Sequence, residues 1–127
     1  MASSMNKIVM RTRYDAFEIE LNDSDTANAL YLALPLEREI NVWGGEIYFE
    51  VPVDQPLQDG RKVMERGEVA YWPEGSAFCI FFGPTPVSKG KAPEAYTPVT
   101  PLGRVVTNLE RLEHLPDRSV VVLEVLY

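Results

Sequence analysis

The chain has 127 residues, 46% of them apolar, which is enough for one packed core. Its 12 basic and 19 acidic residues give a net charge of −7, and the basic residues are scattered rather than clustered. This charge distribution repels phosphate backbones and anionic surfaces, so we expect neither nucleic acid nor a membrane as partner. No apolar run reaches the roughly 18 residues of a membrane span.

Compartment and domain organisation follow from simple features of the chain. We expect no secretory signal, and the single cysteine cannot form an internal disulfide, so a cytoplasmic location is predicted. Residues 1–6 are interpreted as a flexible N-terminal leader. Residues 7–127 are predicted to form a single domain.

Short runs of alternating apolar and polar residues, broken by Gly and Pro, dominate the sequence and indicate β-strands. Residues 77–82 are apolar on both faces, which predicts a central strand covered on both sides. The pattern as a whole predicts a mainly β fold, an antiparallel barrel of about eight strands that is closed or nearly closed. The predicted strands cover residues 8–10, 17–21, 40–43, 47–51, 69–72, 77–82, 102–107 and 119–126.

One main helix is predicted over residues 25–34, where it would close an end of the barrel. Asp23 or Ser24 can cap its N-terminus, and Pro35 ends it. A single apolar stripe runs along it, formed by Ala27, Leu30, Tyr31 and Leu34. One or two further helical turns are predicted over residues 109–115.

Two segments carry no strand pattern and are predicted to be loops. The first covers residues 52–59. The second covers residues 83–101 and contains five prolines, which stiffen it. Long loops in small domains are usually functional, so the second loop is the place to expect a site.

Four segments resemble, in the same order, the small prokaryotic family of cyclophilin-like proteins of unknown function. They are residues 29–35 (ALYLALP), 43–49 (WGGEIYF), 67–73 (GEVAYWP) and 81–86 (FFGPTP). The resemblance extends over residues 8–125 and implies a cyclophilin-type β-barrel. It implies no established reaction, cofactor or catalytic residue. True cyclophilins are prolyl isomerases, but their catalytic motifs are not found in this sequence, so no catalytic residue is assigned.

Aromatic residues gather near strand ends and beside the proline-rich loop. Most of them are expected to be core, because each buries a large area. A concave aromatic wall beside a stiff loop is also typical of ligand sites for apolar groups. Arg104 interrupts an apolar strand, where a charge requires a partner or a ligand. The candidate ligand-binding residues are Tyr48, Trp72, Phe82, Thr85 and Arg104.

The remaining reactive side chains favour structural interpretations. His114, the single histidine, is expected at the surface, and Cys79 in the core. With one histidine and one cysteine, neither a metal site nor a cofactor is predicted. Glu46 and Glu50 alternate with apolar residues, so both are expected to face water.

The sequence thus leaves three functional hypotheses. The first is a binding module that takes a peptide or small apolar ligand in an aromatic pocket. The alternative is a peptidyl-prolyl cis-trans isomerase with non-standard catalytic residues. The third is a structural or assembly role without a pocket. The ligand and the oligomeric state are left open.

Overall fold

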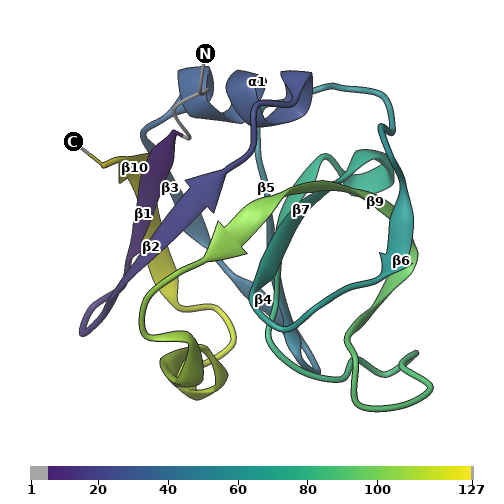
Figure 1. Ribbon diagram of the computed structural model, residues 1–127. Helices are drawn as coiled ribbons and strands as arrows, with labels where there is room; N and C mark the ends of the chain where they lie inside the picture. The colour runs from purple at the N-terminus through teal and green to yellow at the C-terminus, as the bar shows by residue number, and fades with distance from the viewer. Residues whose placement is uncertain (1–5, 127) are drawn as a thin grey trace.

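The computed structural model describes residues 6–126, which form a strongly curled antiparallel sheet of ten strands with one α-helix (Figure 1). Two short 3-10 helices, η1 (Pro73–Gly75) and η2 (Leu109–His114), accompany the helix α1 (Asp25–Ala33). The strands are β1 (Lys7–Arg11), β2 (Ala16–Leu21), β3 (Leu36–Glu39), β4 (Asn41–Trp43), β5 (Glu46–Glu50), β6 (Arg61–Val63), β7 (Glu68–Trp72), β8 (Ala77–Phe81), β9 (Glu94–Val105) and β10 (Val120–Val125).

The strand order is β3-β10-β1-β2-β9-β7-β8-β5-β4, and β6 pairs with β9 outside this path. The end strands β3 and β4 follow one another in the chain with only Ile40 between them, so the two ends of the sheet come together. Arg38 of β3 donates a hydrogen bond to the Glu50 carbonyl of β5 at 2.9 Å. No strand ladder joins β3 to β4 among residues 6–126, so the barrel is open.

The predicted mainly β, antiparallel fold with one main helix is confirmed. Ten strands replace the expected eight or so because β3 and β6 were not predicted. Both are short, and three of the four residues of β3 and two of the three of β6 are charged. Such strands lack the apolar alternation that identifies a half-buried strand in a sequence.

The two ends of the barrel are covered by helical segments. Ser24 caps α1 by accepting a hydrogen bond from the Ala27 N–H at 3.2 Å, and Ala27 and Leu30 are buried. The helix prediction is therefore confirmed, with Leu34 as the C-terminal cap. At the opposite end lies η2, the yellow-green helix of Figure 1, which buries Leu112 and confirms the predicted turns. Between them lies the inner cluster, which includes Ile8, Met10, Phe17, Ile19, Leu21, Ile47, Phe49, Tyr71, Phe78, Ile80 and Leu123.

Strand β9 departs most from the sequence prediction. Residues 94–101 were expected to continue a loop, but they form the first part of a twelve-residue strand that pairs with β6, β7 and β2. Proline is tolerated in strands at bulges and edges, and Pro101 lies opposite a register shift between Val69 and Ala70. Gly103 has φ +147°, and a Cβ there would lie 1.9 Å from the Glu20 carbonyl oxygen. The passage of β9 between β2 and β7 therefore requires glycine.

The first part of β9 covers the outer face of the sheet and creates a second apolar cluster. This outer cluster consists of Met64, Ala70, Ala77, Cys79, Phe81, Ala95 and Val99. Every residue of β8 is buried, so the predicted central strand covered on both sides is confirmed. Cys79 is buried in the outer cluster, as expected.

The described part of the chain begins at Asn6. Apart from Asn6, the predicted leader lies outside the described residues. The Asn6 carbonyl accepts a hydrogen bond from the Leu21 N–H at 2.8 Å.

Within residues 6–126, no helix has the length and apolarity needed to cross a membrane.

We expect residues 7–127 to unfold as one unit, because β5, β7 and β8 contribute to both apolar clusters. Trp43 and Trp72 stand on the outer face of the sheet, so their fluorescence reports the outer cluster, whereas far-ultraviolet circular dichroism reports the whole sheet. The two signals should give coincident urea transitions. A fluorescence transition at clearly lower urea than the circular dichroism transition would mean that the chain unfolds as two units.

Candidate functional site

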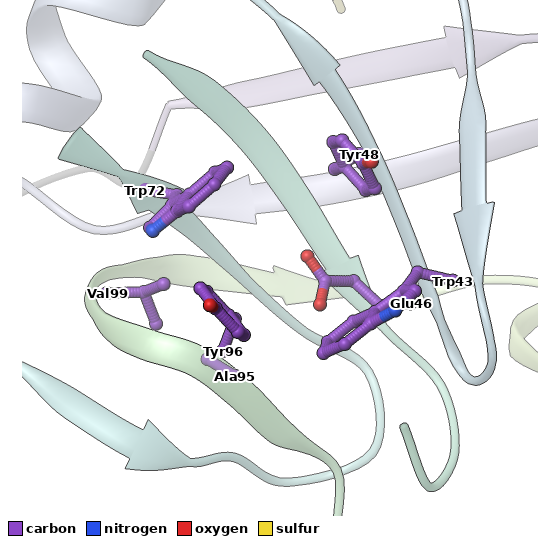
Figure 2. Close-up of a pocket in the computed structure, with 7 residues that line it drawn as sticks. All are labelled: Trp43, Glu46, Tyr48, Trp72, Ala95, Tyr96 and Val99. Carbon is purple, nitrogen blue, oxygen red and sulfur yellow. The ribbon is translucent and has the colours of Figure 1, made fainter. Parts of the chain in front are cut away.

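The outer face of the sheet holds a cavity of about 240 Å³ that opens to solvent. Strands β4, β5 and β7 provide one side of it and the first part of β9 provides the other (Figure 2). The cavity is lined by Trp43, Glu46, Tyr48, Trp72, Ala95, Tyr96 and Val99.

Strand register brings the β4 and β5 side chains together. Trp43 pairs directly with Glu46 across the β4–β5 hairpin, and Tyr48 follows two residues later on the same face. The hairpin turn is packed tightly on the segment after β8: a Cβ at Gly45 would lie 2.2 Å from the Gly83 carbonyl group. Glycine at this position therefore allows the hairpin, and with it Trp43, to sit against that segment.

Small side chains lie on the sheet between two of the aromatic residues of the cavity. Strand β8 lies between β7 and β5, and its buried residues on the outer face include Ala77 and Cys79. Ala77 pairs with Trp72 of β7, and Cys79 pairs with Tyr48 of β5. Because Ala77 and Cys79 are short, the larger rings of Trp72 and Tyr48 project beyond them.

Two contacts connect the sheet side of the cavity to β9. The Trp72 Nε1–H donates a hydrogen bond to the Thr97 hydroxyl at 2.6 Å, which fixes the indole ring. Trp43 and Tyr96 meet edge to face, with ring centroids 6.2 Å apart and an interplanar angle of 83°. Aromatic pairs prefer this arrangement, so both tryptophans are held in place by residues of β9.

Glu46 is the polar group of the cavity, and its carboxylate points in among the aromatic rings (Figure 2). The expectation that Glu46 faces water is wrong, because β9 covers this end of the outer face and leaves the residue 7% exposed. Burial raises the pKa of Glu46 to about 7, against the smaller, lowering effect of a hydrogen bond with Cys79. Glu50, four residues further along the strand, is exposed as predicted.

The other two buried carboxylates have cationic partners. Glu68 receives two hydrogen bonds from Arg61, at 2.6 and 3.1 Å, and one from the Glu65 N–H. Burial by itself would raise the pKa of Glu68, but these bonds and the charges of Arg61 and Arg104 lower it. Glu94 lies 3.0 Å from the Lys89 ammonium and 3.8 Å from that of Lys62. Across residues 6–126, Glu46 forms no ion pair.

The structure brings two of the five candidate ligand-binding residues, Tyr48 and Trp72, to the cavity. Phe82 packs against the inner cluster on the other face of the sheet. Thr85 is buried in the segment between β8 and β9, where its hydroxyl donates to the Glu94 carbonyl. Arg104 is exposed on β9 and pairs with Glu65 at 2.9 Å, so the partner expected for its charge is a carboxylate of the chain itself. These three residues lie outside the cavity.

Comparison with known proteins agrees with the fold. The profile of the family described as cyclophilin-like matches residues 6–124. The chain belongs to this family. A hypothetical protein from Archaeoglobus fulgidus, known from a solution structure, is 35% identical in sequence and superimposes with a TM-score of 0.82 over 98% of each chain. No curated protein matches the sequence. The resemblance inferred from the four motifs is thereby confirmed.

Five cavity residues of this cyclophilin-like protein are not predicted by the sequence pattern: Trp43, Glu46, Ala95, Tyr96 and Val99. Three of them lie in the part of β9 that was assigned to a loop. The apolar pattern of residues 77–82 could have indicated them. A strand that is apolar on both faces requires a packing layer on each face of the sheet. Ala95 and Val99, four residues apart on β9, supply that cover.

The single histidine is not among the residues that line the cavity, whereas the Cys79 thiol hydrogen-bonds with Glu46. His114 is exposed beside Glu113. Burial raises the pKa of the Cys79 thiol well above its ordinary value. In the part of the chain that the structure describes, no three histidine, cysteine or acidic side chains are grouped to hold a metal ion.

Glu46→Gln should change how stability depends on pH. A carboxyl group whose folded pKa is raised stabilises the fold below its unfolded pKa of about 4.5 and loses that contribution as pH rises through about 7. Relative to Glu46→Gln, the wild type should therefore lose up to about 3 kcal/mol of unfolding free energy between pH 4.5 and 7.5. Urea unfolding at each pH measures this difference. Glu50→Gln is the control, and parallel profiles for wild type and Glu46→Gln would contradict the burial of an uncompensated carboxylate.

Proposed function

We propose that this cyclophilin-like protein binds a peptide segment or a small apolar molecule in the cavity on its outer face. The observation that carries this proposal is the convergence of four aromatic rings, those of Trp43, Tyr48, Trp72 and Tyr96, on one hollow. The Trp72–Thr97 hydrogen bond and the Trp43–Tyr96 contact hold three of the rings in position without a ligand. Side chains that are already ordered lose little entropy on binding, which favours affinity.

The size of the cavity limits what it accommodates. Sites for drug-sized molecules occupy about 300–1,000 Å³, and this cavity has about 240 Å³. It therefore suits one amino-acid side chain or a molecule of that size. A peptide ligand would place a single residue in the cavity and lay its remaining residues on the rim, where Tyr96 is exposed.

The prolyl isomerase alternative requires a hydrogen-bond donor toward the prolyl nitrogen in addition to an apolar pocket. In this chain, Arg61 or Arg104 would have to supply that donor from a different place in the sequence. Arg61 is engaged by Glu68 and Arg104 by Glu65, and neither lines the cavity. These contacts favour binding without turnover.

We further propose that the protein acts in the cytoplasm on a ligand other than nucleic acid. The buried, unpaired Cys79 is compatible with a reducing compartment. A net charge of −7 disfavours association with polyanions and anionic membranes.

Tyr96→Ala should weaken ligand binding at a cost in stability of only about 1 kcal/mol, the value of its contact with Trp43. The cost is small because Tyr96 is 64% exposed, and binding weakens because it contributes one wall of the cavity. A fragment library screened by thermal shift supplies ligands, and each is then titrated by tryptophan fluorescence. We expect affinity to fall about three- to tenfold, the value of one aromatic contact. Tyr14→Ala, which removes another exposed tyrosine, is the matched control. A library with no stabilising fragment, or equal effects of the two variants, would count against the proposal.

The isomerase alternative has its own test. In a protease-coupled assay on a proline-containing tetrapeptide, we expect no acceleration over the uncatalysed rate. Arg61→Ala and Arg104→Ala are measured alongside. Strong wild-type turnover that one of these substitutions abolishes would establish catalysis and identify the donor.

A further inference from the structure

The cavity combines an aromatic wall with a carboxylate that has no cation. Burying a charged group is costly unless a partner compensates it. The fold supplies such partners for Glu68 and for Glu94, as the ion pairs with Arg61, Lys89 and Lys62 show. Among the described residues none pairs with Glu46, and its carboxylate opens on the cavity. An occupant of the cavity would therefore meet a buried carboxylate whose charge no described cation compensates.

The rings around Glu46 favour the same kind of occupant. Aromatic faces are electron-rich and attract cations within about 6 Å, most strongly for tryptophan. Two tryptophans and two tyrosines line this cavity. Aromatic residues that surround a cation are a recognised arrangement for ammonium groups, and a carboxylate in their midst adds a full negative charge.

We propose that the ligand carries an organic ammonium group, and that this group enters the cavity to contact Glu46 and the rings of Trp43, Tyr48, Trp72 and Tyr96. This inference rests on the proposed function and names the chemistry of its ligand. Anionic ligands are disfavoured by the same carboxylate. A neutral apolar ligand would leave Glu46 unpaired or protonated. Its affinity would gain nothing from the charge of the Glu46 carboxylate.

The groups that face Glu46 are compatible with this role. Tyr48 comes from its own strand, Cys79 from β8 and Tyr96 from β9, and none of these phenol and thiol side chains is a cation. No lysine or arginine is among the cavity-lining residues. An ammonium group would therefore bring a positive charge that none of the described lining residues supplies.

Binding of the cation should be linked to ionisation of Glu46. With a pKa of about 7 in the empty cavity, most Glu46 is protonated at pH 6 and most is ionised at pH 8. Because the cation binds the ionised form, its affinity should rise about tenfold over this interval. A neutral ligand should show no such rise.

The experiment compares choline with dimethylbutanol, used here as the isomer in which a tert-butyl group replaces the trimethylammonium group of choline. The two molecules have the same shape, but a carbon atom stands in place of the charged nitrogen. The two indole N–H resonances of Trp43 and Trp72 report occupancy directly by NMR, at about 150 mM salt to screen diffuse attraction. Choline should bind about tenfold more tightly at pH 8 than dimethylbutanol. Butylammonium and the blocked tripeptide Ac-Gly-Lys-Gly-amide, added as further probes, distinguish a free amine from a peptide as the source of the group.

Glu46→Gln keeps the shape of the side chain and removes its charge. It should weaken choline binding about tenfold, abolish the rise with pH and leave dimethylbutanol unaffected. Glu50→Gln, an exposed carboxylate of the same strand, is the matched control and should change neither ligand. The wild-type preference for choline and its pH profile test the inference even where Glu46→Gln folds poorly.

The outcomes separate the two proposals. Equal affinity for choline and dimethylbutanol, unaffected by Glu46→Gln, overturns the ammonium inference but leaves an apolar binding site in place. Absence of binding by all four probes and by every library fragment overturns both.

Discussion

The apolar residues on both faces of β8 are the constraint on which the rest of the structure depends. Phe78 and Ile80 belong to the inner cluster, whereas Ala77, Cys79 and Phe81 belong to the outer one. A curled sheet with helical caps buries only the inner set. The outer set needs a second layer, and the first part of β9 provides it by packing Ala95 and Val99 against the outer side chains of β7 and β8. The cavity is the place where this second layer remains incomplete.

The cover formed by β9 is attached at its margins by polar contacts. The Thr85 hydroxyl binds the Glu94 carbonyl, Lys89 pairs with the Glu94 carboxylate, and Trp72 binds Thr97. Gly103 allows β9 to pass close to β2, because any Cβ there would collide with the Glu20 carbonyl. These contacts keep Tyr96 against Trp43 and Thr97 against Trp72. The aromatic walls of the cavity are therefore positioned by other residues of the chain.

Electrostatics distinguishes this cavity from ordinary core. The fold buries Glu68 and Glu94 beside cations that are themselves exposed, Arg61 and Lys89, but buries Glu46 without one. An uncompensated carboxylate lowers stability near neutral pH, as its raised pKa indicates. Sites that bind ligands commonly keep such destabilising groups, because the ligand supplies the missing interaction. The cost in stability and the capacity to bind an ammonium group then have the same origin, and removing the charge should affect both.

Local patterns in the sequence determined most of the fold. The alternation in residues 17–21, the Ser24 cap with the Pro35 stop, and the two apolar faces of residues 77–82 each depend on neighbouring residues, so they can be recognised without the structure. The way in which the cavity residues come together could not be recognised from the sequence alone. It depends on pairings between distant segments, such as Val99 with Arg61 and Tyr71 with Thr100. Pro98 and Pro101, together with three prolines that precede them, concealed the strand character of residues 94–101. Period-two alternation placed Glu46 on the face opposite the inner core without showing that β9 covers that face. Periodicity records which side chains share a face, whereas only the tertiary structure decides what lies on it.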